Sequence, residues 1–141
     1  MSIYGNPITL GGGEDAKIFG VQIGFVNTNS IVIIPTVATE LSDENYFTLS
    51  NKVFTCTKAG SYKITISVKG CYNTSGTRID ATAYAYVNGS SKANVTSSGT
   101  GYYSTSYTTT LSVGDTVELR AKASASGTNR EPIHIIISEQ S

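Results

Sequence analysis

Few side chains in this sequence have the types and spacing that acid–base, nucleophilic or metal chemistry requires. His134 is the sole histidine, and Cys56 and Cys71 are the only cysteines. One histidine and two distant cysteines cannot supply the set of nitrogen and sulfur ligands that a zinc site needs. No Gly-x-Ser-x-Gly motif occurs, and a histidine among isoleucines in a predicted strand is a poor general base. We therefore expect no enzyme activity, no catalytic residue and no cofactor.

Two stretches of the chain are candidate ion-binding sites, one for calcium and one for phosphate. Glu40, Asp43 and Glu44 lie close together in the sequence, and calcium takes about six to eight oxygen ligands. Their spacing lacks the Asp-x-Asp-x-Asp-Gly pattern, so a solvated loop is favoured and calcium binding stays open. The Gly-rich stretch 11–15 lacks the Lys-Ser or Lys-Thr pair of a phosphate-binding loop, and we interpret it as a flexible arm.

Asp115 is the carboxylate with the most informative surroundings. It follows Gly114 in the stretch LSVGDTVELRA, between an apolar pair and an alternating run. Glycine tolerates positive φ and aspartate accepts hydrogen bonds from nearby backbone amides, so the pair suits a tight turn between two strands. We therefore expect Asp115 to be structural. Asp115→Asn should be mild, whereas Gly114→Val should harm folding.

The size and charge of the chain restrict its possible partners. It has 141 residues, 10 basic and 10 acidic side chains and a formal net charge of zero, which fits one ordinary domain and steers it toward neither nucleic acid nor a membrane. No apolar run approaches the ~18 residues of a membrane helix. The opening MSIYGNPITLGGG has no charged or apolar region typical of a signal peptide. We expect synthesis in a reducing cytoplasm, with both cysteines as free thiols.

Period-two alternation of apolar and polar residues recurs along the chain. Turn residues interrupt it at intervals of about 8–12 residues, which is the spacing typical of a sandwich or barrel. The segment 61–70 is the clearest example, and the pair Asn88-Gly89 is a strong hairpin signal. These patterns predict an all-β fold, an antiparallel two-sheet jelly-roll sandwich of eight to ten strands.

Loops that carry tyrosines, and a strand with apolar residues on both faces, are the candidate sites of contact with a ligand or a second subunit. Tyrosines in loops rich in serine, asparagine and glycine supply contact area at low entropic cost, so they could stack on a sugar ring or be buried between subunits. The candidate ligand-facing residues are Tyr72, Asn73, Tyr102 and Tyr103. A last strand that is apolar on both faces is covered on both, within its own domain or by a neighbouring subunit. The candidate residues of a trimer interface are Tyr84, Tyr86, His134 and Ile136.

Three segments occur in an order that resembles a known family. They are YFTLSNKVFTCTKAGSYKITISV, ATAYAYVNGSS, and TTTLSVGDTVELRA followed by PIHIIIS. Their order and spacing over about residues 20–138 resemble the jelly-roll heads of complement-component-one-q-like domains in the tumour-necrosis-factor-like superfamily. The resemblance implies a ten-stranded jelly roll, a tight homotrimer, binding by exposed loops and no catalysis. The sequence departs from the family in having no collagen-like stalk, no signal peptide and few aromatic residues in the last strand.

The opening of the chain is similar to leader segments of small virion or baseplate proteins of phages. We expect residues 1–15 to form a docking arm and residues 16–141 to form the head. The docking residues of the arm would be Ile3, Tyr4, Pro7, Ile8 and Leu10. The predicted function is a trimeric structural module on the surface of a phage virion, as a capsid decoration or head fibre, made in the host cytoplasm. The alternatives are a tail or baseplate protein that recognises host-surface glycan, and a bacterial spore-surface or adhesive head.

Overall fold

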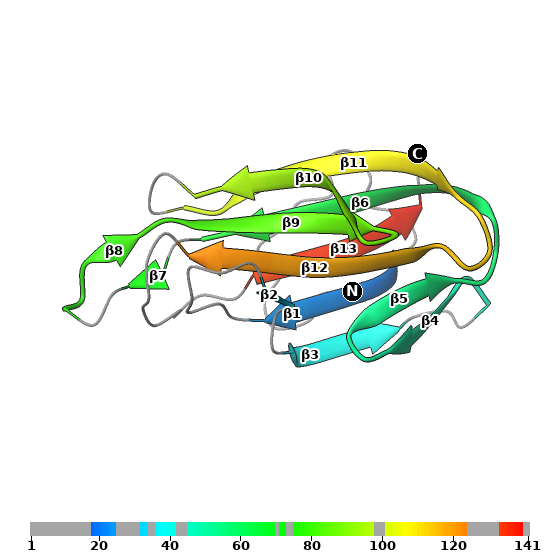
Figure 1. Ribbon diagram of the computed structural model, residues 1–141, viewed down its shortest axis with the longest axis horizontal. Coiled ribbons are helices and arrows are strands. Elements are labelled where there is room, and N and C mark those ends of the chain that lie inside the picture. The colour runs from blue at the N-terminus through cyan, green and yellow to red at the C-terminus, as the bar shows by residue number, and fades with distance from the viewer. Residues whose placement is uncertain are drawn as a thin grey trace.

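The computed structural model is built from β-strands, and no helix occurs in the residues that it describes (Figure 1). Those residues are 18–24, 32–33, 36–41, 45–69, 71–72, 75–97, 101–123 and 133–139. The strands are β1 (Ile18–Gly24), β2 (Val32–Ile33), β3 (Thr36–Leu41), β4 (Phe47–Ser50), β5 (Val53–Cys56), β6 (Gly60–Val68), β7 (Cys71–Tyr72), β8 (Arg78–Ile79), β9 (Ala81–Val87), β10 (Ser90–Thr96), β11 (Tyr103–Leu111), β12 (Thr116–Ala123) and β13 (Ile133–Glu139).

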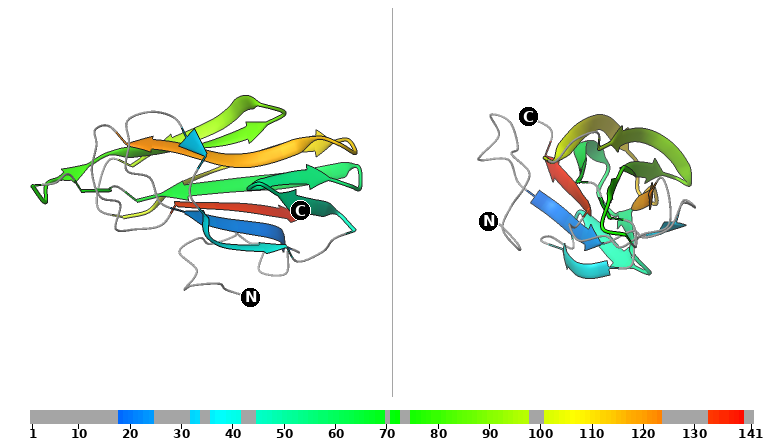
Figure 2. Two further views of the ribbon diagram at one scale, coloured as in Figure 1. Left: turned by 60° about the horizontal axis from the view of Figure 1, so that its bottom comes forward. Right: turned by 90° about the vertical axis from the view of Figure 1, so that its left-hand side faces the viewer.

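Two large antiparallel sheets pack face to face, which the second view in Figure 2 shows end-on. The first sheet has the strand order β11-β6-β13-β1-β3, and the second has the order β10-β9-β12-β5-β4, with β2 also paired to β12. β7 and β8 form a separate two-stranded ribbon. The two main paths hold ten strands of four or more residues. The predicted fold class, an all-β two-sheet jelly roll, is therefore confirmed.

The period-two alternation sends one face of each sheet into a shared core. Ile64 and Ile66 of β6 and Ala83, Ala85 and Leu119 of the opposite sheet are all fully buried. The side chains between them along each strand point the other way, because successive residues of a strand face opposite sides of the sheet. Burying one aliphatic side chain of this size stabilises the fold by about 1.5–3 kcal/mol. The alternation seen in the sequence thus determines which face of each strand is buried.

Aromatic side chains fill one end of the core. The Phe19 and Tyr46 rings stack with centroids 4.4 Å apart, and Tyr62 meets Phe19 edge-on at 5.4 Å. Gly20 of β1 leaves the room that Phe54 needs, since a Cβ atom at position 20 would lie 2.5 Å from Phe54 Cε1. A side chain of any size at this position would therefore require β1 or the ring to move.

The corner between β11 and β12 is a hydrogen-bonded turn. Gly114 has a φ of 97°, which few residues with a side chain adopt. The Asp115 carboxylate accepts a hydrogen bond from the Ser112 amide at 2.8 Å and one from Asn88 Nδ2 at 3.2 Å, while the Thr116 amide donates to Asn88 Oδ1 at 3.0 Å. Asp115 thus links its own turn to the neighbouring Asn88-Gly89 hairpin. The predicted turn geometry of both pairs is confirmed.

Candidate functional site

The outward face of the first sheet carries two of the predicted interface residues. His134 and Ile136 of β13 alternate with the core residues Ile135 and Ile137, so they point away from the core. In the register of the sheet, His134 lies opposite Ser67 of β6. The two outward side chains are nevertheless only 2% and 4% exposed. Both faces of the last strand are thus covered within the chain, which is one of the two alternatives that the sequence left open. A contact with a second copy stays a prediction.

His134 is held as a neutral imidazole. Among the described residues, neither ring nitrogen has a hydrogen-bond partner, and the Oγ atom of Ser67 has none either. Burial disfavours the charged ring and lowers the pKa of His134 from 6.5 to about 4. A general base must lie within hydrogen-bonding distance of the group whose proton it accepts, and a further group must orient it. In the described part of the chain, the ring has no such orienting carboxylate.

The predicted ligand-facing tyrosines lie in different environments. Tyr102 is half-buried just before β11. The centroid of its ring lies 5.9 Å from the centroid of the His134 ring and 5.4 Å from Lys69 Nζ. Tyr103 is the first residue of β11 and packs against the core, so its expected loop position is wrong. Tyr72 is paired within the β7–β8 ribbon rather than placed in a free loop, and Asn73 lies outside the described residues. Whether any of them contacts a ligand stays a prediction.

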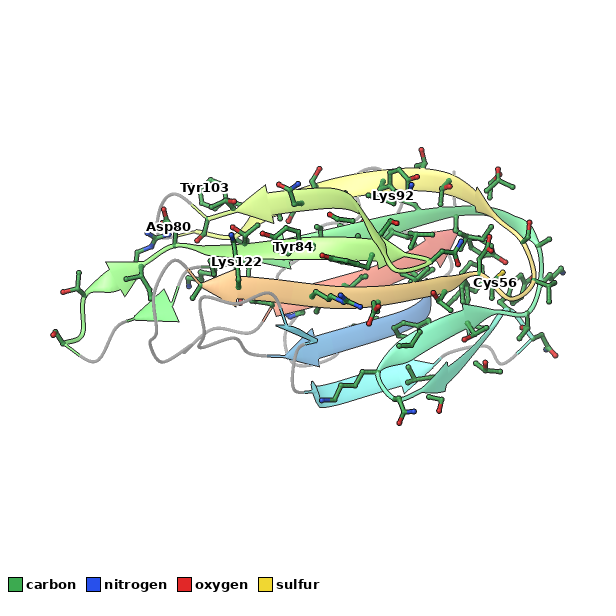
Figure 3. All side chains as sticks on the ribbon, in the orientation of Figure 1. Cys56, Asp80, Tyr84, Lys92, Tyr103 and Lys122 are labelled. Carbon is green, nitrogen blue, oxygen red and sulfur yellow. The ribbon has the colours of Figure 1, made fainter. Side chains whose placement is uncertain are left out.

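The outward face of the second sheet holds the other pair of predicted interface residues. The Tyr84 and Tyr86 rings of β9 lie edge to face with centroids 6.2 Å apart. The Arg120 guanidinium of β12 sits over the Tyr86 ring at 4.2 Å and bonds to Glu118 Oε1 at 2.8 Å. Figure 3 shows Tyr84 on β9 and Lys122 on β12, the adjacent strand. Both tyrosines are half-buried on this face, and their contact with a second copy stays a prediction.

Glu118 and Arg120 of β12 are site residues that were not among the predicted contact residues. The Glu118 side chain is 8% exposed, although it lies on the sheet face away from the core. Its Oε2 atom and the Arg120 Nε atom are buried and have no hydrogen-bond partner in the part of the chain that the structure describes. The signal was present in the sequence: an acidic and a basic residue two positions apart on one strand face of β12, opposite two tyrosines of β9. That spacing identifies the pair but gives no measure of its burial.

Several predicted positions cannot be placed. The arm residues Ile3, Tyr4, Pro7, Ile8 and Leu10 lie outside the described residues, as do Asp43 and Glu44. Within the described ranges, no group of three or more His, Cys, Asp or Glu side chains could hold a metal ion. The described residues also contain no helix long and apolar enough to span a membrane. Cys56 is a buried free thiol, as expected, and the pKa of this thiol is raised by burial.

Comparison with known proteins identifies the fold class. No protein-family model matches the sequence, and no curated protein matches it. Among solved structures, the PRD1 vertex protein P5 is similar with a TM-score of 0.59 and 14% identity, over 88% of this chain and 99% of that chain. Murine APRIL is similar with a TM-score of 0.53 and 10% identity, over 85% and 98% of the two chains. Bushbaby GITRL is similar with a TM-score of 0.53 and 12% identity, over 87% and 95%.

These likenesses extend over nearly the whole of each compared chain, at identities that show the fold alone. The protein therefore has the jelly-roll fold of tumour-necrosis-factor-like proteins, a fold that the vertex protein also has. The fold resemblance found in the sequence is confirmed by these structures. The fold is shared by proteins with different roles, so the role of this chain must be argued from its own surfaces.

Proposed function

We propose that this protein is a non-enzymatic structural module of a phage particle, displayed as a homotrimer on the capsid surface and docked through residues 1–15. The observation that carries the proposal is the likeness to the PRD1 vertex protein P5, which covers 99% of that chain. The role would be a capsid decoration or head fibre that projects the jelly-roll head from the virion. The arm would contribute the apolar anchors, and the head would carry no catalytic group.

The surface of the head supports a contact between copies that is largely polar. Val113 is the single large apolar side chain that is exposed in the described residues. The outward side of β11 carries instead a row of exposed hydroxyl side chains, namely Ser104, Ser106, Thr108 and Thr110. The Thr65 and Ser106 hydroxyls already lie 3.1 Å apart across β6 and β11. We therefore expect an interface built from hydroxyl and tyrosine side chains around a small apolar centre.

Sedimentation equilibrium tests the trimer directly. One chain has a mass of 14.9 kDa, and we expect a single species with the mass of three chains. A species with the mass of one chain across the concentration range would refute the trimer. Measurements over a wide range of protein concentration are needed, because association depends on mass action.

Deletion of residues 1–15 tests the docking role of the arm. The truncated chain should fold, with the circular dichroism spectrum of a β-protein, but should be absent from purified particles. A matched control replaces the same residues by a Gly/Ser segment of equal length, which keeps the length but removes the apolar anchors. Normal incorporation of either variant would refute docking through the arm.

A second candidate function is an adhesive head that recognises host-surface glycan, as part of a tail or baseplate or on a spore surface. The observation that favours it is the pair of half-buried tyrosines on the outward face of the second sheet, with a charged cluster beside them. Aromatic rings flanked by polar side chains are a common composition of binding surfaces. Retention of the purified chain on intact host cells, and its loss when surface glycans are removed, would distinguish this function from decoration.

A further inference from the structure

We propose that the outward face of the second sheet binds an acidic saccharide, with Tyr84 at the centre of the site. The inference deepens the second candidate function given above, and it requires neither the trimer nor the arm. It also moves the expected ligand contact from the loops to a sheet face, where strand pairing fixes the position of each side chain.

Strand register places Tyr84 in the middle of a group of polar side chains. In the antiparallel pairs, Tyr84 of β9 lies opposite Arg120 of β12 on one side and opposite Asn94 of β10 on the other. Thr82 and Tyr86 are two residues away along β9, so they share its face. Directly opposed side chains on one sheet face have Cβ atoms about 4.5–5.5 Å apart. Five hydrogen-bonding neighbours, Lys122 included, therefore surround the half-buried ring of Tyr84, and Asn94 is the most exposed of them.

This arrangement matches the chemistry of a pyranose ring. One face of such a sugar presents C–H groups, which are attracted to the negative face of an aromatic ring. Its hydroxyl groups project around the rim, where side chains such as Asn94 and Thr82 can donate and accept hydrogen bonds. Thr82 and Thr96 already hold their hydroxyl oxygens 2.8 Å apart across β9 and β10. The site thus combines an apolar platform with polar groups at its edge.

An ion pair lies beside the tyrosines of the site. Arg120 sits over the Tyr86 ring and donates a hydrogen bond to Glu118 Oε1 at 2.8 Å. This pair holds the Tyr86 ring in place next to Tyr84, so the aromatic part of the site is fixed before a ligand binds.

The charge on this face favours an acidic saccharide over a neutral one. Glu118 neutralises Arg120, whereas Lys122 lies opposite Thr82 on the same face and forms no ion pair with a described residue. One free ammonium group beside an aromatic platform complements a single carboxylate or phosphate on a sugar. Single-stranded nucleic acid would need a track of cations along its backbone, and this face of β12 offers only Lys122 beyond the paired Arg120.

Isothermal titration calorimetry of the full chain with defined probes measures the affinity of the proposed site. The acidic probes are tetrasaccharides of galacturonate, of mannuronate and of alternating glucuronate and N-acetylglucosamine. Maltotetraose is the neutral saccharide, poly-aspartate is the anion without a sugar ring, and a thymidine octanucleotide is the nucleic acid. We expect at least one acidic tetrasaccharide to bind more tightly than all three comparison probes, with an affinity that weakens as salt increases.

Three variants connect that binding to the proposed residues. Tyr84→Ala should weaken it by about tenfold or more, whereas Tyr84→Phe, which keeps the ring, should stay within about threefold. Lys122→Gln should weaken binding and reduce its salt dependence, and Lys63→Gln on the other sheet is the matched control that should change neither. Unchanged thermal unfolding of Lys122→Gln separates a lost contact from a lost fold.

Four outcomes would overturn the proposal. These are no binding to any acidic tetrasaccharide, equal binding of poly-aspartate, tighter binding of the octanucleotide, or full affinity of Tyr84→Ala. None of them affects the particle-incorporation test of the arm, so failure of this site and failure of the decoration function remain distinguishable. If the purified chain binds an acidic tetrasaccharide but is not retained on intact host cells, that result would count against the adhesive role alone.

Discussion

The buried imidazole of His134 makes the stability of this fold depend on pH. The ring is 2% exposed, its nitrogens have no hydrogen-bond partner among the described residues, and burial lowers its pKa from 6.5 to about 4. The unfolded chain therefore takes up a proton at a higher pH than the folded chain, so stability is full above pH 6.5 and falls as the pH decreases toward 4. One pKa unit corresponds to about 1.4 kcal/mol, so the complete loss is about 3 kcal/mol.

Urea unfolding of the wild type and of His134→Leu, followed by circular dichroism at one protein concentration, measures this contribution. Leucine keeps an apolar side chain of similar size but cannot take up a proton, and carboxylates that titrate in both proteins cancel in the difference. Between about pH 7 and about pH 4.5, the free energy of unfolding of the wild type should fall relative to the variant by about 1.4 kcal/mol per pH unit once the pH is below the unfolded-state pKa. Two parallel curves over this range would refute a depressed pKa and, with it, the burial of the ring.

Three further substitutions test other parts of the structure. Gly114→Val should cost about 1–3 kcal/mol, because a β-branched residue at a φ of 97° is strained; a cost near zero would mean that the turn adopts another conformation. Gly20→Ala should cost about 1–3 kcal/mol, because its Cβ would lie 2.5 Å from Phe54 Cε1, and urea unfolding measures it directly. Arg120→Ala should cost about 1–3 kcal/mol by leaving the Glu118 carboxylate without its partner, and the simultaneous replacement of Glu118 by Leu should recover much of that loss.

The faces of the long strands could be predicted from the sequence because burial in a sandwich has a period of two. The apolar residues that alternate in β6, β9 and β12 are the ones that the structure buries in the core. The turns at Asn88-Gly89 and at Gly114-Asp115 could also be predicted, because the conformations they require restrict the residues that can occupy them.

Features that depend on neighbouring strands could not be predicted in the same way. A two-residue strand such as β7 has no period to detect, and its pairing with β8 is a tertiary contact. The alternation places the side chain of Glu118 on the outward face of β12, yet that side chain is buried. Local sequence determines which way a side chain points, whereas its exposure depends on what packs over it. The candidate site was therefore predicted by residue type, through its tyrosines, and not by location.

The hydrogen bonds between Asn88 and Asp115 have a consequence for the chemical lifetime of the protein. An asparagine followed by a glycine is prone to lose ammonia when the next backbone nitrogen attacks its side-chain carbonyl carbon, which leaves aspartate or isoaspartate. In the folded chain the Asn88 amide donates to Asp115 and accepts from Thr116, so the attacking geometry is available mainly after this corner opens. Deamidation would then place two carboxylates side by side, and the aged corner would close less readily than the original. The extent of deamidation at Asn88 in stored protein should therefore increase with the time that this corner has spent locally unfolded.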